Sequence, residues 1–424
     1  MNFRDSDALK AVLEADGHTL VDNESEADLV LLNTCSVRDC AEAKALGKAG
    51  RLLKNKRTNP RYRLGIIGCM AARRGQQLTK LLPQLDWVLP PPALNDIPHL
   101  IQETLRTNTP KVITDFQPYT FACYEQSLPF TPVRWIPIQQ GCAMGCSYCI
   151  VPQTRGHQQN RPFDSILREA QTAAAQGTRE IILLGQIVNA YHDNGKTFVD
   201  LLYALQAIDG IERIRFVSPH PNFFTDRLIQ CFKTLPKCCP SVHLPIQSAS
   251  NRILEHMHRG YTQEKLTTLI QALRSIQPQL SLSTDLIVGY PSETDADFDQ
   301  TVQFFKKIQF DMAYIFKYSP RPNTPAAEWV ATNGISKDVQ EQRNQVLLDC
   351  LSQASLRYNQ QFVHTYQSVL VEGHAPKGAH KLFGRSFFNK KVIFDGDSSI
   401  IGSFQSVWIE RATTSALEGC IKPV

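Results

Sequence analysis

Three cysteines stand close together in the segment Gly-Cys-Ala-Met-Gly-Cys-Ser-Tyr-Cys (141–149). The C-x3-C-x2-C spacing of Cys142, Cys146 and Cys149 lets three thiolates hold three irons of a [4Fe-4S] cube, and no fourth Cys stands near enough in the sequence to bind the fourth iron. Structural metal sites usually fill every coordination position, whereas catalytic sites keep one open. The spacing therefore predicts a cube with an open iron, which can chelate a small molecule and pass it one electron.

A zinc knuckle and incidental buried cysteines are the alternatives to a cluster. Zinc prefers four ligands, usually in two spaced pairs, and His157 lies too far along the chain to complete a finger-like spacing. Tyr148, Ile150 and Val151 supply the aromatic and apolar flanks of a loop that shields a cube. We therefore favour the iron–sulfur interpretation.

The whole chain has the composition of an ordinary water-soluble protein. It has 424 residues, 42% hydrophobic and 20% charged, which is enough for two or three domains. No window approaches 18 uncharged apolar residues, and the polar start is no signal peptide, so we expect no membrane association. Twelve cysteines without a secretion signal indicate a reducing compartment and metal chemistry, which predicts a cytoplasmic protein. The net charge of +5 permits a nucleic-acid partner without requiring one.

Residues 1–115 alternate between helical and strand patterns. A helical pattern covers 7–15, and short apolar runs at 27–32, 64–67 and 86–89 predict strands. Strands separated by helices indicate a parallel sheet, in which ligands bind at the carboxyl ends of the strands. Cys35 and Cys69 each follow such an end, so we expect them to face one crevice.

Residues 116–134 form a Pro-punctuated linker, and residues 135–356 repeat strand then helix six times. The predicted strands are 136–140, 180–184, 213–217, 241–244, 282–288 and 312–318. Helical patterns lie between them, at 165–176, 225–233, 263–276 and 295–308 among others. This order predicts a partial (βα)6 barrel with its chemistry on the loops after the strands, and the cysteine loop follows the first strand.

Residues 361–424 change to alternating apolar and polar positions with intervening glycines. The predicted strands are 367–372, 387–393, 401–405 and 406–409. Short alternating strands of this kind predict a small antiparallel β-barrel. The chain is thus an α/β protein with a small all-β module at its end.

Several segments together resemble one protein family. They are Asn-Thr-Cys-Ser-Val-Arg (33–38), Gly-Cys-Met-Ala (68–71), the cysteine loop with Ile-Val-Pro-Gln-Thr-Arg-Gly (150–156), Leu-Leu-Gly-Gln-Ile-Val-Asn-Ala-Tyr (183–191), His-Leu-Pro-Ile-Gln-Ser (243–248), Met-His-Arg-Gly-Tyr (257–261) and Thr-Asp-Leu-Ile-Val-Gly-Tyr-Pro-Ser-Glu-Thr (284–294). They resemble the radical S-adenosylmethionine (SAM) methylthiotransferases, most closely the MiaB family of tRNA 2-methylthio-N6-dimethylallyladenosine synthases. The likeness runs over nearly the whole chain.

The resemblance implies a radical reaction on tRNA. In the family, SAM takes the open iron, and one electron cleaves it to a 5′-deoxyadenosyl radical. The C2–H of a prenylated adenosine at position 37, beside the anticodon, is then replaced by C2–SCH3. An aromatic C–H has no acidity that a His or Glu could use, which is why a radical is needed. The resemblance further implies a second methyl-donating SAM, an auxiliary sulfur-supplying [4Fe-4S] cluster, an electron donor such as a flavodoxin or ferredoxin, and a monomer.

The same resemblance divides the chain into a methylthiotransferase domain (1–115), a radical-SAM barrel (135–356) and an RNA-binding TRAM domain (361–424). The family holds its auxiliary cluster with three cysteines, and Cys35 and Cys69 match the second and third of them. The first belongs to a strand that precedes the first helix, and Met1 aligns just past it. We expect that the start of the chain has been assigned too late, so that a short leading segment with the first cysteine is missing. Recruitment of Cys40 is the alternative, although Cys40 stands about one helical turn beyond Cys35.

Four residues at strand ends of the predicted barrel are candidates for the SAM site: Gln186, Asn189, Gly289 and Glu293. The alternative is that they are turn residues, with Ser292 as a helix N-cap. His220, between two prolines, is either a polar site residue or part of a rigid turn. Cys231, Cys238 and Cys239 are expected to be core thiols.

Residues 48–63 carry seven Lys or Arg and no acidic residue. Lys54, Lys56 and Arg57 are candidates for binding tRNA phosphates, and Arg73 and Arg74 would extend the patch. The alternative is a solvated helix face.

Phe387 and Lys390 in the C-terminal module are candidates for stacking on and pairing with RNA, although the Phe could instead fill the small core. A methylthiotransferase acting on a ribosomal-protein side chain and a non-catalytic iron–sulfur RNA-binding protein are the competing functions. The terminal module is expected only to add RNA contacts.

Overall fold

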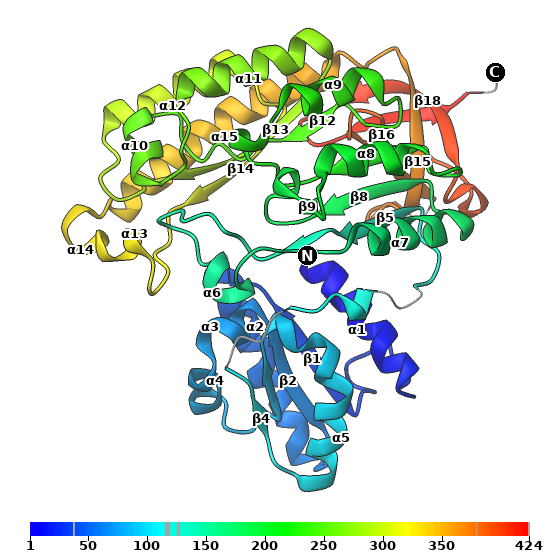
Figure 1. The fold of residues 1–424 in the computed structure, drawn as a ribbon, viewed down its shortest axis with the longest axis vertical. Helices are drawn as coiled ribbons and strands as arrows, with labels where there is room; N and C mark the ends of the chain where they lie inside the picture. The colour runs from blue at the N-terminus through cyan, green and yellow to red at the C-terminus, as the bar shows by residue number, and fades with distance from the viewer. Residues whose placement is uncertain (37–38, 115–118, 125–127, 379, 423–424) are drawn as a thin grey trace. The chain divides into compact units, whose positions relative to one another are not determined.

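The computed structural model describes residues 1–36, 39–114, 119–124, 128–378 and 380–422. They form two compact units, each described by itself (Figure 1). The first unit comprises Met1–Leu128, Gln139–Met144 and Cys149–Arg161. The second comprises Pro129–Ile138, Gly145–Tyr148 and Pro162–Val424. The segment 139–161 therefore contributes to both units.

The first unit is built on a parallel four-stranded sheet in the order β1-β2-β3-β4, as predicted from the short apolar runs. The strands are β1 (Leu29–Thr34), β2 (Arg63–Gly68), β3 (Trp87–Leu89) and β4 (Lys111–Val112). The last was not predicted, because two residues carry no periodic signal. The helices are α1 (Asn2–Ala15), α2 (Asp39–Leu52), α3 (Cys69–Arg74), α4 (Gln76–Leu81), α5 (Ile97–Thr107) and α6 (Val151–Arg155).

Side chains of this sheet alternate between two hydrophobic clusters. Trp87 and Leu89 pack with residues of α1 and α5, whereas Val88 packs with residues of α2, α3 and α4. Both faces of the sheet are therefore covered, which explains why its strands are continuous apolar runs. The short pair β6 (Gln139–Gln140) and β7 (Gln159–Asn160) also belongs to this unit.

The second unit contains the six parallel strands of the predicted partial barrel. They form two three-stranded sheets: β5 (Val133–Pro137), β8 (Glu180–Leu184) and β11 (Arg213–Phe216), then β12 (Ser241–His243), β13 (Ser281–Val288) and β14 (Met312–Lys317). The sheets are joined where the Ile214 amide donates to the Lys237 carbonyl at 2.7 Å and the Cys239 amide donates to the Ile214 carbonyl at 3.0 Å. A small hairpin, β9 (His192–Asp193) and β10 (Lys196–Thr197), lies between β8 and the next helix.

Helices follow the barrel strands: α7 (Phe163–Ala175), α8 (Phe198–Gln206), α9 (Asp226–Thr234), α10 (Asn251–His256), α11 (Gln263–Ile276), α12 (Asp295–Ile308), α13 (Pro325–Glu328), α14 (Val330–Asn333) and α15 (Lys337–Gln360). Capping boxes at Thr197 with Asp200 and at Thr294 with Asp297 fix where α8 and α12 begin, because each pair satisfies free amides of the first turn. The predicted helices at 263–276 and 295–308 are confirmed to the residue.

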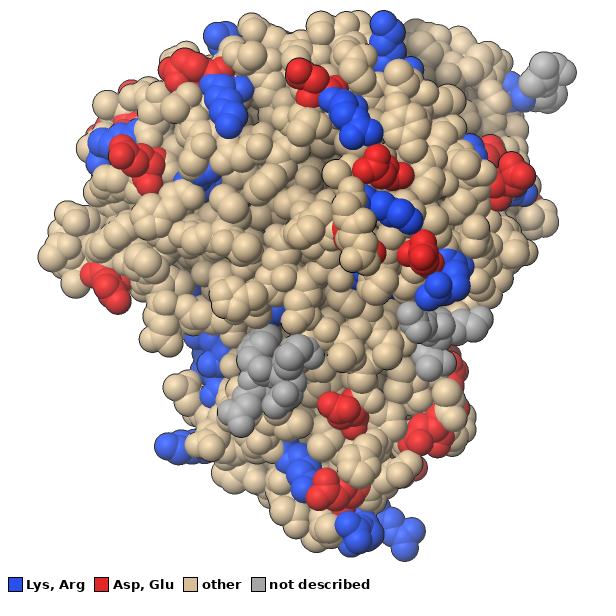
Figure 2. Space-filling view, in the orientation of Figure 1, with Lys and Arg blue, Asp and Glu red and all other residues tan. Residues whose placement is uncertain are grey.

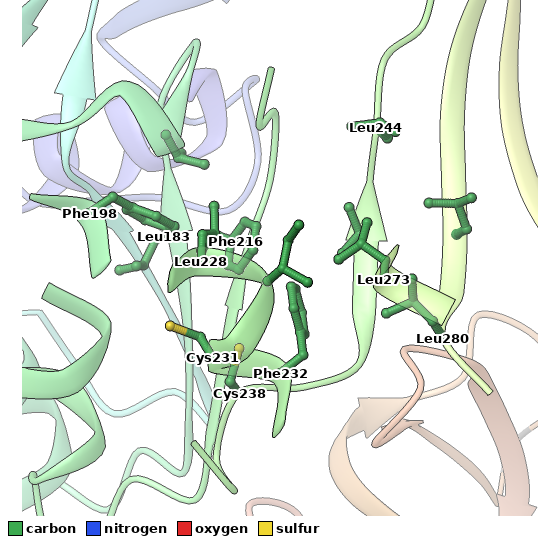
Figure 3. Packing of buried hydrophobic residues seen from close by; sticks show 14 of the residues in the cluster. Leu183, Phe198, Phe216, Leu228, Cys231, Phe232, Cys238, Leu244, Leu273 and Leu280 are labelled. Carbon is green, nitrogen blue, oxygen red and sulfur yellow. The ribbon is translucent and has the colours of Figure 1, made fainter. Parts of the chain in front are cut away.

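The main hydrophobic core lies between these strands and helices. Figure 3 shows Phe216 of β11 and Phe232 of α9 among leucines from several elements. The thiols of Cys231 and Cys238 lie in the same core, and burial raises the pKa of Cys231 to about 11 and that of Cys238 well above its ordinary value (Figure 3). Cys239 is also buried, which raises its pKa to about 12. These cysteines are the core thiols that the sequence predicted.

The C-terminal module is a closed five-stranded barrel in the order β15-β16-β17-β19-β18, which confirms a β-barrel, although β17 and β19 pair in parallel and not antiparallel as predicted. Its strands are β15 (Tyr366–His374), β16 (Lys381–Ser386), β17 (Lys391–Asp395), β18 (Phe404–Ala412) and β19 (Leu417–Ile421). The predicted strand at 387–393 is wrong in its first half. Asn389 adopts a left-handed φ of 62°, and Ser386 and Lys390 are bonded across a turn, so the chain reverses at 387–390.

This module is bonded to strand β11 by two buried arginines. Arg213 donates to the carbonyls of Arg385 (2.8 Å) and Ser368 (2.7 Å). Arg215 donates to the carbonyls of Phe387 (3.0 Å) and Ser386 (2.8 Å). The module therefore also has a structural part in this unit, because its carbonyls satisfy two buried charges of the partial barrel.

Across the described residues, no helix is long and apolar enough to span a membrane.

Candidate functional site

The middle of the cysteine loop is fixed by the segment that follows α10. The Ser147 amide donates to the Met257 carbonyl at 3.3 Å, and its hydroxyl donates to the His256 carbonyl at 2.7 Å. The same hydroxyl lies 2.7 Å from the hydroxyl of Tyr290. Because Ser147 is fully buried and bonded through both groups, it holds residues 145–148 in place within the second unit.

Cys146 lies next to a buried arginine. Nη1 of Arg259 is 3.3 Å from Sγ of Cys146, while its Nε donates to the Tyr261 hydroxyl at 2.8 Å and its Nη2 to the Pro245 carbonyl at 2.9 Å. Arg259 is only 6% exposed. Sequence reasoning did not single it out, although a Met-His-Arg-Gly-Tyr motif with a cation beside a predicted barrel site was a usable signal.

Cys142 and Cys149 belong to the first unit, and backbone amides point at both sulfurs. The Met144 amide donates to Sγ of Cys142 at 3.4 Å, and the Val151 amide donates to Sγ of Cys149 at 3.5 Å. Amide hydrogen bonds to cysteine sulfur are a normal part of iron–sulfur sites. All three cysteines are only partly exposed.

No group of three or more His, Cys, Asp or Glu among the described residues is arranged around one metal ion. A cube binds each thiolate through a different iron, so its ligands need not converge on one point. The chemistry of the donors at 142–149, three thiols with amide donors at two sulfurs and a guanidinium at the third, fits such a group.

Cys35 and Cys69 leave neighbouring strands at the same edge of the first-unit sheet. Thr34 is the register partner of Gly68, and the Thr34 hydroxyl donates to the Ile67 carbonyl at 2.6 Å. Gly68 has a φ of +91°, and a Cβ there would lie 2.7 Å from the Thr34 carbonyl oxygen. Only glycine permits this close approach. The two strand ends are therefore held together, and a crevice shared by the two cysteines stays a prediction.

A buried charge network ties the residue after Cys35 to the helix that begins at Cys69. Glu42 of α2 accepts bonds from Ser36, Arg73 and Arg74, with the Arg74 Nε at 2.9 Å. Burial alone would raise the pKa of Glu42, but the bonds from Arg73 and Ser36 outweigh it and the pKa is lowered. Arg73 and Arg74 are thus both bonded to this carboxylate, and their extension of a tRNA-binding patch stays a prediction. Cys40, in α2, is exposed.

Three of the four predicted SAM residues are bonded to protein groups. The Asn189 side chain exchanges two hydrogen bonds with the His220 backbone, of 3.0 and 2.8 Å. Glu293 accepts from the Gly289 amide and from Arg343 of α15, both at 2.7 Å. Burial is the main cause that raises the pKa of Glu293 to about 6. Gly289 is positioned by packing, because a Cβ would lie 2.3 Å from Gln340 Cγ. Asn189, Gly289 and Glu293 therefore stabilise the conformation of the loops in which they lie.

Two side chains near the carboxyl ends of β8 and β11 keep a buried polar atom that has no hydrogen-bond partner among the described residues. They are Oε1 of Gln186 and Nε2 of His220. Nδ1 of His220 accepts from the Asn222 amide at 3.2 Å, so its Nε2 carries the proton when the ring is neutral. Burial, helped by Arg259 and Lys265, lowers the pKa of His220 to about 3. Gln186 therefore keeps an unused acceptor, and neutral His220 keeps an unused donor.

The basic residues predicted to contact RNA differ in their exposure and in their protein partners. Lys54 and Arg57 are exposed, as a phosphate-binding role requires. Lys56 instead pairs with Asp86 at 2.6 Å and donates to the Gln84 carbonyl at 2.7 Å. Its ammonium is therefore occupied within the first unit.

Lys390 is also a correction. Its Nζ lies 2.6 Å from Oδ1 of Asp311, and the residue is 8% exposed, so it cannot meet a phosphate. Phe387 is partly buried, with the Arg213 guanidinium 5.7 Å from its ring centre. On the face drawn in Figure 2, Lys and Arg side chains lie singly or beside Asp and Glu side chains.

Two family models match the chain. Residues 136–305 match the radical SAM superfamily, and residues 1–90 match an uncharacterized protein family, UPF0004. The fold agrees with solved structures. A radical SAM methyltransferase, TsrM of Kitasatospora setae, has a TM-score of 0.54 at 14% identity over 76% of this chain and 73% of that one. The radical enzyme OxsB has a TM-score of 0.51 at 12% identity over 77% and 48%. The second unit thus has the fold of a radical SAM protein.

The similarity to curated proteins identifies the family to which the chain belongs within the radical SAM class. A tRNA-2-methylthio-N(6)-dimethylallyladenosine synthase of Opitutus terrae is 43% identical over 99% of this chain and 95% of that protein. The synthase of the same name from Akkermansia muciniphila is 40% identical over 99% and 96%. The chain belongs to the tRNA-2-methylthio-N(6)-dimethylallyladenosine synthase family.

Proposed function

We propose that this protein places a methylthio group on C2 of N6-(dimethylallyl)adenosine at position 37 of tRNA, beside the anticodon. The observation that carries the proposal is full-length similarity to synthases of this name in a chain that keeps Cys142, Cys146 and Cys149. The cofactors are an iron–sulfur cluster and SAM. One-electron cleavage of SAM at such a cluster supplies the hydrogen-abstracting chemistry that an unactivated aromatic C–H requires.

In this proposal the protein's own residues bind and orient. Cys142, Cys146 and Cys149 hold the SAM-binding cluster, and Ser147 fixes the loop. Gln186 and His220 give a buried acceptor and a buried donor to the bound nucleoside-type molecule. Asn189, Gly289 and Glu293 hold the surrounding loops in shape.

We assign the auxiliary [4Fe-4S] cluster to Cys35 and Cys69 in the methylthiotransferase domain (1–115). The support is the close approach of the two strand ends and the Glu42 network beside them. Hydrogen-bonded supporting groups of this kind orient ligands and tune metal sites.

The tRNA is the partner, with Lys54 and Arg57 contacting phosphates and Phe387 offering an aromatic face. A flavodoxin or ferredoxin supplies the electron, and the protein acts as a cytoplasmic monomer. The module at 361–424 is the TRAM domain, and 135–356 is the radical-SAM barrel.

Nucleoside mass spectrometry of tRNA tests the proposal. Cells lacking the gene should accumulate the dimethylallyl nucleoside without its methylthio derivative, and the wild-type gene should restore the derivative. The Cys146→Ala variant should not restore it, because the thiolate is a cluster ligand. Persistence of the methylthio nucleoside in the deletion strain refutes the proposal. A mass change in a ribosomal protein in the same cells would instead identify the competing substrate.

A further inference from the structure

Arg259 is a buried cation that lacks a carboxylate partner. It is 6% exposed, its charged or polar neighbours include Cys146, Tyr148, Tyr261 and His220, and in the described part of the chain it forms no ion pair with an Asp or Glu. A buried charge without a counter-charge costs several kcal/mol, so buried charges are normally paired. The Cys146 sulfur, 3.3 Å from Nη1, can supply the missing negative charge when it is a thiolate.

The other two bonds of Arg259 fix the direction of its guanidinium. Nε is bonded to the Tyr261 hydroxyl and Nη2 to the Pro245 carbonyl. Tyr261 is itself anchored, because its hydroxyl donates to the Ile246 carbonyl at 3.1 Å. With two of its donor positions fixed in this way, the planar group can aim Nη1 at only one place. That place is the sulfur of one cysteine of the 142–149 loop.

We infer that Arg259 is a positioning residue that holds the Cys146 thiolate in its ligating position and raises the reduction potential of the SAM-binding cluster. The inference rests on the proposed function for the identity of that cluster. A cube that takes up an electron gains negative charge, and a fixed cation in a poorly screened site stabilises the charged state. Charge and hydrogen bonds at the sulfurs are among the factors that set iron–sulfur potentials.

The test is a redox titration followed by electron paramagnetic resonance, on full-length protein reconstituted without oxygen. Cys35→Ala and Cys69→Ala are added to every variant so that only the 142–149 cluster contributes. In Arg259→Met the ratio of reduced to oxidised cluster at a fixed solution potential should fall about tenfold, equivalent to about 59 mV for one electron. Arg259→Lys loses the planar fork but keeps the charge, so it should retain most of the wild-type ratio.

Two control variants separate charge from packing. Arg227→Met removes an exposed cation of the same unit, paired with exposed Asp200, and should leave the ratio unchanged. Tyr261→Phe removes the Nε partner but keeps the guanidinium, so it should shift the ratio less than Arg259→Met does.

Each outcome decides the inference. Iron retained with Lys but lost with Met supports it, because charge alone then holds the ligand. Equal ratios in the Met and Lys variants, or loss of iron from both, overturn it and leave Arg259 a packing residue. None of these results depends on tRNA. Methylthio nucleoside made by the wild-type protein can therefore uphold the proposed function while this inference fails.

Discussion

Asp5 and Arg155, 150 residues apart in the sequence, form a buried ion pair of 2.7 Å inside the first unit. Arg155 is 5% exposed and also donates to Gln140 at 2.8 Å, while the other oxygen of Asp5 accepts from the Tyr124 hydroxyl. The pair joins α1 to α6, the helix that begins two residues after Cys149.

Asp5→Asn should therefore destabilise the first unit by about 3 kcal/mol, because it leaves the Arg155 charge buried and unbalanced. Hydrogen exchange read by mass spectrometry should show faster exchange in peptides covering α1 and α6. Glu14→Gln, an exposed change on α1, is the matched control and should leave exchange unchanged. Equal protection in Asp5→Asn and wild type would show that the pair contributes little.

Glu42→Gln should reduce the iron bound through Cys35 and Cys69. The change weakens the bonds to Arg73 and Arg74 that tie the two cysteine-bearing segments together. Iron is measured in a Cys146→Ala background, so that the auxiliary site dominates. Glu26→Gln, at an exposed position, provides the comparison. Equal iron in the two variants would mean that the cysteines are positioned without the network.

His220 should make the protein less stable in mild acid. Its pKa is lowered to about 3 by burial, so below the ordinary value near 6.5 the unfolded chain takes up a proton that the folded chain does not. Stability is therefore retained above pH 6.5 and lost as the pH falls, by about 2 kcal/mol at pH 5. Urea unfolding at pH 7 and pH 5 should show a smaller loss for His220→Gln. The same loss in both proteins would contradict the assignment.

Lys390→Met should destabilise the second unit by about 3 kcal/mol, because Asp311 stays buried without its partner. The folded variant should bind tRNA like the wild type, measured by filter binding. Lys391→Met, at the neighbouring partly buried position, should cost less stability. Weaker tRNA binding with normal stability would restore Lys390 as an RNA contact.

Lys54→Ala with Arg57→Ala should weaken tRNA binding and reduce the slope of log K against log salt by about 1 per residue. Because both side chains are exposed, unfolding free energy should change by less than about 0.5 kcal/mol. Lys306→Ala with Lys307→Ala, two exposed positions at the end of α12, removes the same charge elsewhere. An unchanged salt slope in the Lys54→Ala, Arg57→Ala variant would show that the basic residues at 48–63 form a solvated surface that does not bind tRNA.

Local pattern was enough to predict most of the fold. Strand β8 is a short apolar run, and α11 and α12 begin at threonine caps, so their signals lie within a few residues. The turn at 387–390 was missed because two phenylalanines continue the alternating strand pattern. What reverses the chain there is the left-handed Asn389 and the bonding of Ser386 to Lys390.

The candidate site was harder to predict because partners lie far apart in the sequence. In the sequence, nothing near Lys56 or Lys390 indicates an ion-pair partner. In the structure, Lys56 pairs with Asp86 and Lys390 pairs with Asp311. The position of Glu293 after a predicted strand made it a candidate site carboxylate, but its hydrogen bond from Arg343 of α15 could not be predicted from the sequence. Arg259 was missed for the same reason, since its contact with Cys146 spans 113 residues.

The sharing of segment 139–161 between the two units also constrains how the protein is made. The Arg155 partner of Asp5 is synthesised 150 residues later, and the His256 carbonyl that holds Ser147 comes 109 residues after that serine. At a synthesis rate of about 5–20 residues per second, Arg155 is added roughly 8–30 s after Asp5, so the ion pair cannot form before then. The cysteine loop waits again until α10 is synthesised, so a further 109 residues must be added before the His256 carbonyl can hold Ser147.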